Sequence, residues 1–248
     1  MLTTKEGGRV WIDRMVLELW KTAPGLSPQE IQLRLSARGS RPEQILAGLA
    51  CLAEAGLLGR SASAPPEPAI LAQHSDLVSV IIVSYNSRFC LPGCLNSLVA
   101  QSYAPVEIVV VDNASQDGSA VCIQDNHPHV RLIRLGKPVP LAQALNIGLH
   151  TATGKYHLLL NPDVRVDPGA IARLVHTAQS KPGCAAVSAN LRLLWEPCFL
   201  NGLGNLVGAL AWGTDIGLGH LDLGQFGNWD EIPSACFAAA LIPAQALE

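Results

Sequence analysis

From residue 77 onward, short apolar runs rich in β-branched residues alternate with stretches of helical periodicity. Continuous Val, Ile and Leu runs are typical of strands buried on both faces, and strands that alternate with helices form parallel sheets. We therefore predict an α/β domain with a mostly parallel sheet flanked by helices. The predicted strands are Val78–Val83, Val106–Val111, Val130–Leu135 and Tyr156–Leu160, and the predicted helices are Leu91–Ala100, Gly118–Asn126, Leu141–Thr151 and Pro168–Ser180.

The first 60 residues have a different pattern, which predicts a small helical domain. Apolar residues recur at helical spacing over Val10–Trp20, and two further segments, Ser27–Gly39 and Ser40–Leu58, begin with Ser and place Pro and Glu in the first turn. Three short helices resemble a winged-helix domain, although the nearly balanced charge favours an accessory or docking module over DNA binding. Residues 61–76 are rich in Ala, Ser and Pro and predict a linker. The predicted domains are thus 1–60 and 77–248.

Composition narrows the classes of partner. The chain has 17 Lys and Arg against 20 Asp and Glu, a net charge of -3, so its charge does not favour binding to nucleic acid. Its 7 Cys form no Cys-x-x-Cys pair, and the odd number predicts reduced thiols in the cytoplasm rather than a disulfide framework. We interpret Cys90 and Cys94, one helical turn apart, as buried core residues.

Two stretches bear on membrane association. The N-terminus contains Arg9, Asp13 and Arg14, so it does not have the apolar region of a signal peptide. The stretch 199–219 is poor in charge but is interrupted by Asn, Asp and six Gly, whereas a spanning helix needs about 20 mostly apolar residues. We predict loop and partly buried surface there, and no transmembrane segment, although peripheral membrane contact is compatible with the sequence.

Polar side chains follow three of the predicted strands at the point where each strand ends. Ligands of parallel α/β sheets bind beyond the carboxyl ends of the strands, so these residues are the first candidates for a site. A carboxylate there can accept hydrogen bonds from a nucleotide base or a ribose hydroxyl, although an Asx turn that closes the strand is an alternative interpretation of Asp112. The candidates are Ser84, Tyr85, Asn86, Asp112, Asn113, Ser115, Asn161 and Asp163.

Asn161 and Asp163 flank Pro162 directly after a buried strand, and Asp167 follows. Two oxygen-bearing side chains on one rigid turn are suitable ligands for a hard divalent cation, which commonly shares its coordination with substrate phosphates. An Asn-Pro-Asp turn without that role is also common. The sequence therefore predicts Mg²⁺ or Mn²⁺ at this turn.

The chain contains three segments in this order: Val-Ser-Val-Ile-Ile-Val-Ser-Tyr-Asn, Val-Val-Val-Asp-Asn-Ala-Ser-Gln-Asp-Gly-Ser and Leu-Leu-Leu-Asn-Pro-Asp-Val. Together they resemble family 2 glycosyltransferases of the GT-A fold. The Asn-Pro-Asp form is similar to that of rhamnosyltransferase-like members. The resemblance covers the chain from about Leu77. It implies inverting transfer of a sugar from a nucleoside-diphosphate-sugar donor to a glycan or lipid-linked acceptor, as in polysaccharide biosynthesis.

The resemblance also assigns roles to residues. It implies that Ser84, Tyr85 and Asn86 line the nucleotide site and that Asp112 holds the base or ribose, in a loop shaped by Asn113 and Ser115. Asp163 is the implied main metal ligand, and Asn161 is implied to bind the metal weakly or through water. Asn146 matches the polar residue of the helix that packs beside the donor.

The sequence departs from the family pattern in two places. The first is at 136–143, where family members usually have an Asn-x-Gly turn and this chain has Gly-Lys-Pro-Val-Pro-Leu-Ala-Gln. The segment Pro233–Pro243 looks like the strand before the acceptor site, and the family's Gly-x-x-Asp-Glu segment and catalytic base come after such a strand. We therefore expect the base beyond Glu248 and interpret Asp230 and Glu231 as loop. The expectation for these 248 residues is donor and metal binding with little or no transfer.

Three alternatives remain open at this point. The larger domain is either a transferase, a nucleotide-sugar sensor coupled to the helical domain, or the effector receptor of a DNA-binding regulator. A nucleotidyltransferase is disfavoured because Ser84-Tyr85-Asn86-Ser87 is not a Gly-rich phosphate loop. His127 and His129 are interpreted as a solvated turn rather than a metal pair, and Arg131 and Arg134 as a solvated strand face rather than diphosphate ligands.

Overall fold

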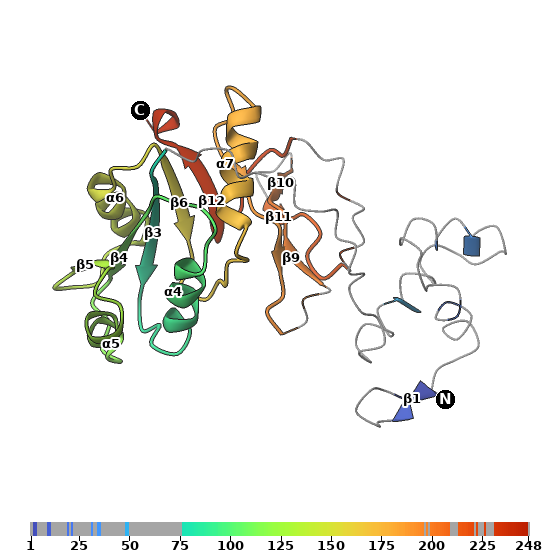
Figure 1. The fold of residues 1–248 in the computed structure, drawn as a ribbon, viewed down its shortest axis with the longest axis horizontal. Helices are drawn as coiled ribbons and strands as arrows, with labels where there is room; N and C mark the ends of the chain where they lie inside the picture. Colours follow the sequence, from blue (N-terminus) through green and yellow to red (C-terminus); the bar gives the residue numbers. More distant parts are fainter. Residues whose placement is uncertain are drawn as a thin grey trace.

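The protein is described from a computed structural model (Figure 1). The structure describes residues 76–247 except 196, 198, 209–212, 221, 223–225 and 227–230, together with isolated positions ahead of residue 76. Those positions include two short paired strands, β1 (Leu2–Thr3) and β2 (Arg9–Val10). Val10, the predicted start of a helix, lies in β2 because its backbone pairs with Leu2. Most of the predicted helical domain and linker lie outside the described residues, so both stay predictions.

Six strands form one sheet in the order β5–β4–β3–β6–β12–β7 (Figure 1). The first four of that order are parallel to one another, and β12 runs antiparallel to both of its neighbours. The prediction of an α/β fold with a mostly parallel sheet is confirmed. The strands are β3 (Val78–Ser84), β4 (Val106–Asp112), β5 (Arg131–Arg134), β6 (Tyr156–Leu160), β7 (Val187–Ser188) and β12 (Ala239–Pro243).

Helices cover both faces of the sheet, and successive side chains of each strand face opposite cores. Val80 and Ile82 of β3 lie in the larger core, with residues of α4, α5 and α7, whereas Ile81 lies in a smaller core against α6. Burial on both faces explains the continuous apolar runs Val80–Val83, Ile108–Val111 and Leu158–Leu160. The helices are α4 (Leu91–Val99), α5 (Ser119–Asn126), α6 (Leu141–Thr151) and α7 (Ala170–Ser180).

The segment between α7 and β12 carries two small antiparallel pairs, and three of their four strands lie in 199–219, where we predicted loop and partly buried surface. The pairs are β8 (Leu191–Arg192) with β9 (Leu200–Gly202), and β10 (Asn205–Val207) with β11 (Gly213–Asp215). Strands of two or three residues are too short to show a period of two, which is why the sequence did not reveal them. A single-turn helix η1 (Ala244–Ala246) follows β12. No helix among the described residues is long and apolar enough to cross a membrane.

Candidate functional site

The ends of β3 and β4 lie side by side at the carboxyl edge of the sheet. Ser84 and Asp112 are partners in the parallel register, and the N–H of Asn113 donates to the carbonyl oxygen of Ser84 at 2.8 Å. Both side chains are buried, with exposed fractions of 0% for Ser84 and 2% for Asp112. The first two strand ends that the sequence singled out therefore form one surface.

Asp112 and Ser84 retain unused hydrogen-bonding groups. One carboxylate oxygen of Asp112 accepts the N–H of Ser115 at 3.2 Å. Among the described residues, however, neither its Oδ1 nor the hydroxyl of Ser84 has a hydrogen-bond partner. Buried polar atoms without partners are rare, because each forfeits the hydrogen bonds that it would make with water. The Asx-turn interpretation accounts for Oδ2 only, whereas the unpartnered Oδ1 and hydroxyl are suited to a ligand.

The two loops that follow these strands bind each other through side chains. The hydroxyl of Ser115 accepts the N–H of Asn86 at 2.9 Å, and the side-chain oxygen of Asn86 accepts the N–H of Gln116 at 2.8 Å. Asn86 and Ala114 have φ angles of 51° and 62°. The left-handed conformation costs a non-glycine residue about 1 kcal/mol or more and is commonly retained where a site requires it.

Asn113 connects β4 to the loop ahead of α6. Its side chain donates to the carbonyl of Val139 and accepts the N–H of the same residue, both at 2.9 Å. The amide is therefore engaged with the protein backbone, which favours a role in shaping the site. Asn146 lies in α6 with an exposed side chain, and its carbonyl oxygen lies 2.6 Å from Nδ1 of His150.

The turn after β6 is held against both of its neighbours. The N–H of Asn161 donates to the carbonyl of Ala238 ahead of β12 at 2.9 Å, and the thiol of Cys94 in α4 donates to the carbonyl of Asn161 at 3.7 Å. The side chains of Asn161 and Asp163 are exposed. Both therefore reach solvent at the carboxyl edge, on a turn whose backbone is fixed.

The geometry of the sheet sets the span of the candidate site. Leu160 is the register partner of Ile82, so Asn161–Asp163 extend beyond the edge next to Tyr85. β3 lies between β4 and β6, and strands in a sheet are about 4.8 Å apart, so the ends of β4 and β6 are roughly 10 Å apart. A nucleotide laid across this edge can therefore meet Asp112 near one end and Asp163 near its phosphates.

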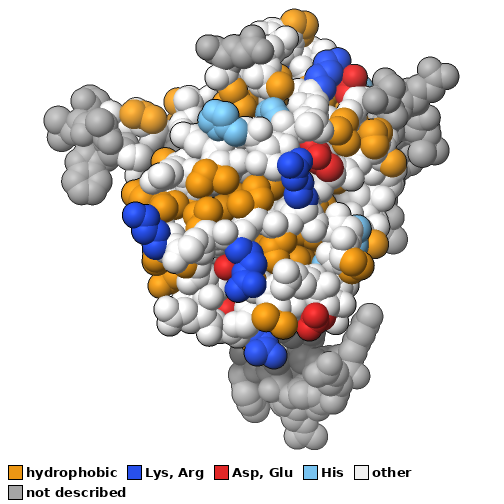
Figure 2. Space-filling view, turned by 90° about the vertical axis from the view of Figure 1, so that its left-hand side faces the viewer, with side chains coloured by type: hydrophobic (Ala, Val, Ile, Leu, Met, Phe, Trp, Pro, Cys, Tyr) orange, Lys and Arg blue, Asp and Glu red, His pale blue; other side chains and the backbone are white. Residues whose placement is uncertain are grey.

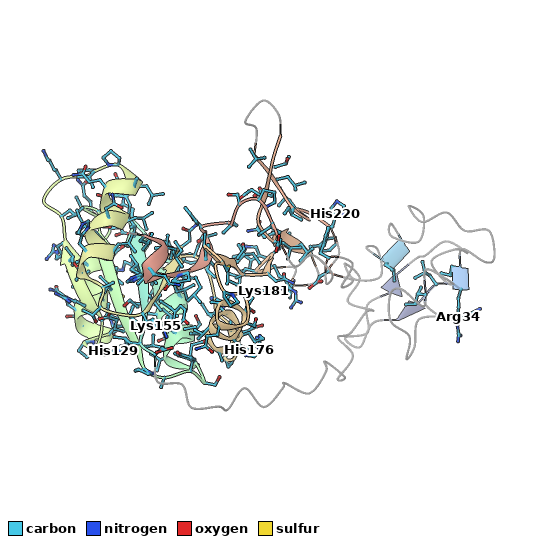
Figure 3. All side chains as sticks on the ribbon, turned by 90° about the horizontal axis from the view of Figure 1, so that it is seen from above. Arg34, His129, Lys155, His176, Lys181 and His220 are labelled. Atoms are coloured by element: carbon cyan, nitrogen blue, oxygen red, sulfur yellow. The ribbon has the colours of Figure 1, made fainter. Side chains whose placement is uncertain are left out.

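The donor atoms at the turn suit a cation that is also bound by a substrate. Asn161 and Asp163 offer an amide and a carboxylate oxygen, and Mg²⁺ in proteins is commonly bound by one or two carboxylates, substrate phosphates and water. Within the described ranges, no group of three or more His, Cys, Asp or Glu side chains could hold a metal by itself. His129, His176 and His220 lie in different parts of the molecule (Figure 3).

Cys90 and Cys94 were interpreted as core residues, and the surroundings of Cys94 support this. Its side chain is fully buried, and burial, followed by the nearby Cys90 and the negative charge of Asp163, raises the pKa of the Cys94 thiol to about 12. A thiol with that pKa stays protonated at neutral pH and is a poor metal ligand.

The other polar candidates differ in their environments. Arg131 and Arg134 are exposed, as predicted, and Arg134 is the register partner of Asp112. His127, in contrast, is buried rather than solvated, because the turn between α5 and β5 packs onto the core; its ring centroid lies 5.9 Å from that of exposed His129. Burial, followed by the nearby His129, lowers the pKa of His127.

Glu231 lies outside helices and strands, whereas Asp230 is outside the described residues.

Sequence reasoning overlooked the residues that hold the first loop to α5. The carboxylate of Asp117 accepts the N–H of Arg88 and the N–H of Ser119, both at 2.9 Å, and the hydroxyl of Ser119 accepts the N–H of Ser87 at 3.0 Å. An Asp-Gly-Ser sequence directly before a helix is a signal for such a cap. These side chains position the site and are turned toward the backbone.

The Lys and Arg side chains on the side of the molecule that carries α6 and β5 stand apart from one another, with acidic side chains beside some of them (Figure 2). A nucleic-acid interface gathers basic residues into a patch or stripe. The described part of this face does not have that character.

Comparison with known proteins identifies relatives of this part of the chain. Residues 79–192 match the family model for glycosyl transferase family 2. Glycosyltransferase GlyG of Streptococcus pneumoniae is 33% identical over 112 residues, covering 43% of this chain and 36% of the relative. An N-acetylglucosaminyl-diphospho-decaprenol L-rhamnosyltransferase of Mycobacterium tuberculosis is 28% identical over 129 residues, covering 48% of this chain and 42% of the relative.

Among solved structures, the mannosyltransferase PcManGT of Pyrobaculum calidifontis, in complex with GDP-Man and Mn²⁺, has a TM-score of 0.44 at 24% identity, covering 72% of this chain and 47% of that chain. The matched part of this chain spans about a third of the length of the curated relatives GlyG and ExoO, the latter a succinoglycan biosynthesis protein of Rhizobium meliloti.

Proposed function

We propose that the part of the chain around residues 79–192, which matches the family model for glycosyl transferase family 2, is a GT-A-type domain that supplies the donor site for transfer of a sugar from a nucleoside diphosphate to the hydroxyl of a glycan or lipid-linked acceptor. The observation that carries the proposal is the carboxyl edge of the sheet. Buried Asp112 with an unpartnered oxygen and exposed Asp163 lie on β4 and after β6, two strands apart. The names of the relatives, which include polysaccharide synthases, support a glycan acceptor.

Each part of the site contributes one interaction. Asp112 Oδ1 accepts a hydrogen bond from the base or the ribose, and the exposed ring of Tyr85 offers a surface to the base. Asp163, assisted by Asn161, would hold Mg²⁺ or Mn²⁺ where the diphosphate binds. When bound, the cation offsets negative charge on the leaving nucleoside diphosphate, a Lewis-acid contribution. The backbone of the turn is held by hydrogen bonds to Ala238 and Cys94, so the backbone needs little ordering when a donor binds.

Calorimetric titration tests the metal role of Asp163. The purified chain is titrated with UDP-, GDP- and dTDP-sugars, in MnCl₂ and in EDTA. We expect binding that needs Mn²⁺, and we expect Asp163→Asn to weaken it about 10-fold or more because a carboxylate ligand is lost.

Asp167→Asn is the matched control, since Asp167 is an exposed carboxylate of the same loop whose backbone carbonyl, rather than its side chain, accepts from Gln101. Equal affinities of wild type and Asp163→Asn in MnCl₂ would contradict the metal site. Release of the nucleoside diphosphate in the presence of glycan acceptors then measures transfer.

A further inference from the structure

Phe237 is an exposed aromatic residue at the same edge of the sheet as the candidate site. It lies two residues ahead of β12, and 57% of its surface is exposed, about the same fraction as Tyr85 at 55%. In the sheet order β3–β6–β12, the turn Asn161–Asp163 lies between these two aromatic residues. The turn Asn161–Asp163, which we call the metal turn because we propose that it binds the cation, thus has one exposed aromatic residue on the strand to each side.

The backbone that carries Phe237 is fixed at several points. The N–H of Ala239 donates to the carbonyl of Cys236 at 3.2 Å, which closes a turn with Phe237 and Ala238 at its centre. The N–H of Cys236 donates to the hydroxyl of Ser188 at 3.1 Å, and the carbonyl of Ala238 accepts the N–H of Asn161 at 2.9 Å. The ring is therefore presented from a held backbone that is bonded directly to the metal turn.

The order of the strands gives the order of the ligand's parts. If the nucleoside lies at β4 and β3 and the diphosphate at the turn after β6, the sugar continues in the same direction, and the next strand is β12. One strand spacing is about 4.8 Å, which is about the width of a pyranose ring. The first residue with a large side chain at that position is Phe237.

We propose that Phe237 is the surface on which the pyranose ring of the nucleotide-sugar donor stacks. This proposal rests on the proposed function and deepens it. One face of a pyranose presents C–H groups, which carry a small positive charge and are apolar. An aromatic face is negative and apolar, so the two surfaces attract each other and exclude water from each other. An aromatic ring can thereby bind the sugar beside the metal, and no charged side chain has to be buried there.

The test compares the donor with the same molecule without its sugar. Calorimetry in MnCl₂ measures the Kd of the best-bound nucleoside diphosphate among UDP, GDP and dTDP, and of its sugar derivative, for wild type, Phe237→Ala, Phe237→Tyr and Val121→Ala. Val121 is the matched control because 52% of its surface is exposed, on α5. We expect Phe237→Ala to weaken binding of the sugar derivative about 3- to 10-fold and to leave the nucleoside diphosphate unchanged. Phe237→Tyr and Val121→Ala should behave as wild type.

Two results overturn the role of Phe237: equal affinity of wild type and Phe237→Ala for the sugar derivative, and an equal loss for both ligands, which indicates damage to the metal turn. Unchanged binding of the nucleoside diphosphate also reports that the variant is folded. A wild-type chain that binds none of the nucleoside diphosphates contradicts the proposed function itself and removes the premise for Phe237.

Discussion

Ser84 and Asp112 keep hydrogen-bonding groups that the protein does not use. A buried carboxylate with one oxygen unpartnered is costly to the fold, and replacement by a neutral group of the same shape removes a charge that is out of water. Such a residue is retained when a ligand needs it. The stability of the fold and the binding of a nucleotide therefore make opposite demands on Asp112.

Asp112→Asn tests this separation. We expect the variant to unfold at a temperature within a few degrees of the wild type, and to bind the nucleoside diphosphate about 10-fold more weakly, because a hydrogen bond to a charged acceptor contributes about 1.5–3 kcal/mol. Thermal unfolding and calorimetry measure the two quantities. Asp125→Asn, an exposed carboxylate on α5, is the control. Unchanged nucleotide affinity in Asp112→Asn would show that Asp112 only closes its turn.

His157 is a buried histidine at the other edge of the sheet. It lies in β6 opposite Ser79 of β3 and Ile242 of β12, and its Nδ1 has no hydrogen-bond partner in the part of the chain that the structure describes. Burial lowers the pKa of His157, and the nearby Glu107 opposes that change only in part. The folded protein therefore favours the neutral imidazole, whereas the unfolded chain takes up a proton near pH 6.5.

The free energy of unfolding is accordingly expected to be constant above about pH 6.5 and to fall as the pH drops from there toward the lowered pKa, by at most about 1.4 kcal/mol per pH unit for each histidine. The unfolded state binds more protons in that window, which gives the sign. His127, whose pKa is also lowered, adds to the effect. Urea titrations at pH 7.5, 6.5 and 5.5 measure it, and His157→Gln should show a smaller dependence. Identical pH profiles of the two proteins would contradict this origin.

At the residue level, the sequence singled out residues at strand ends but did not show which of their side chains bind other parts of the protein. Asn86, Asn113 and Ser115 were predicted as donor-binding residues from their position after strands. Their side chains bind backbone groups of neighbouring loops instead of being left available. Residue type alone does not distinguish these uses, because Asn and Ser bind backbone as readily as they bind a ligand. The ligand role of all three stays a prediction.

Among the elements, α6 packs most closely on the sheet at a glycine. A Cβ on Gly148 would lie 2.5 Å from Cγ2 of Ile81 and 3.3 Å from Cγ2 of Val111. The first distance is shorter than real contacts allow, and Ile81 is fully buried on the central strand. The glycine lets the helix approach the sheet closely and so fixes where the loop held by Asn113 meets the site.

Gly148→Ala should therefore destabilise the protein although alanine is the better helix former. Overpacking of this kind costs about 1–3 kcal/mol, whereas the gain in helix propensity is about 1 kcal/mol. We expect a net loss of up to about 2 kcal/mol, measured by urea unfolding. In Gly136→Ala, where an added Cβ meets nothing within 4 Å, the midpoint should stay close to that of the wild type. If the urea midpoint of Gly148→Ala were as high as that of the wild type, α6 would be able to move away from the sheet at little cost in free energy.

The strands and helices with long, regular patterns were predicted well. Strands β3, β4 and β6 and helix α6 lie within a residue of the predicted bounds, because each has a continuous apolar run or a clear helical period. The four short strands β8–β11 were not predicted, because each forms by pairing with another strand and has no recognisable sequence pattern of its own. The sequence of a two- or three-residue strand does not indicate which strand it pairs with.

For the whole molecule, the sequence predicted the class of sheet but neither its strand order nor the direction of β12. Alternation of strands and helices implies parallel pairing for β3 to β6. No crossover helix with a clear pattern precedes β12 among the described residues, so periodicity leaves its direction open. That direction matters for the site, because an antiparallel β12 brings its beginning, rather than its end, to the carboxyl edge.

This reversed strand has a consequence for biosynthesis. Leu160 pairs with Ala239, which is added to the chain 79 residues later. A ribosome-bound intermediate that already contains β3 to the turn Asn161–Asp163 has every group that we assign to the nucleotide and the cation, yet that turn lacks the carbonyl of Ala238 that holds it. Contacts between segments so distant in sequence form late. We therefore expect the proposed site to retain a donor firmly only after translation has passed β12.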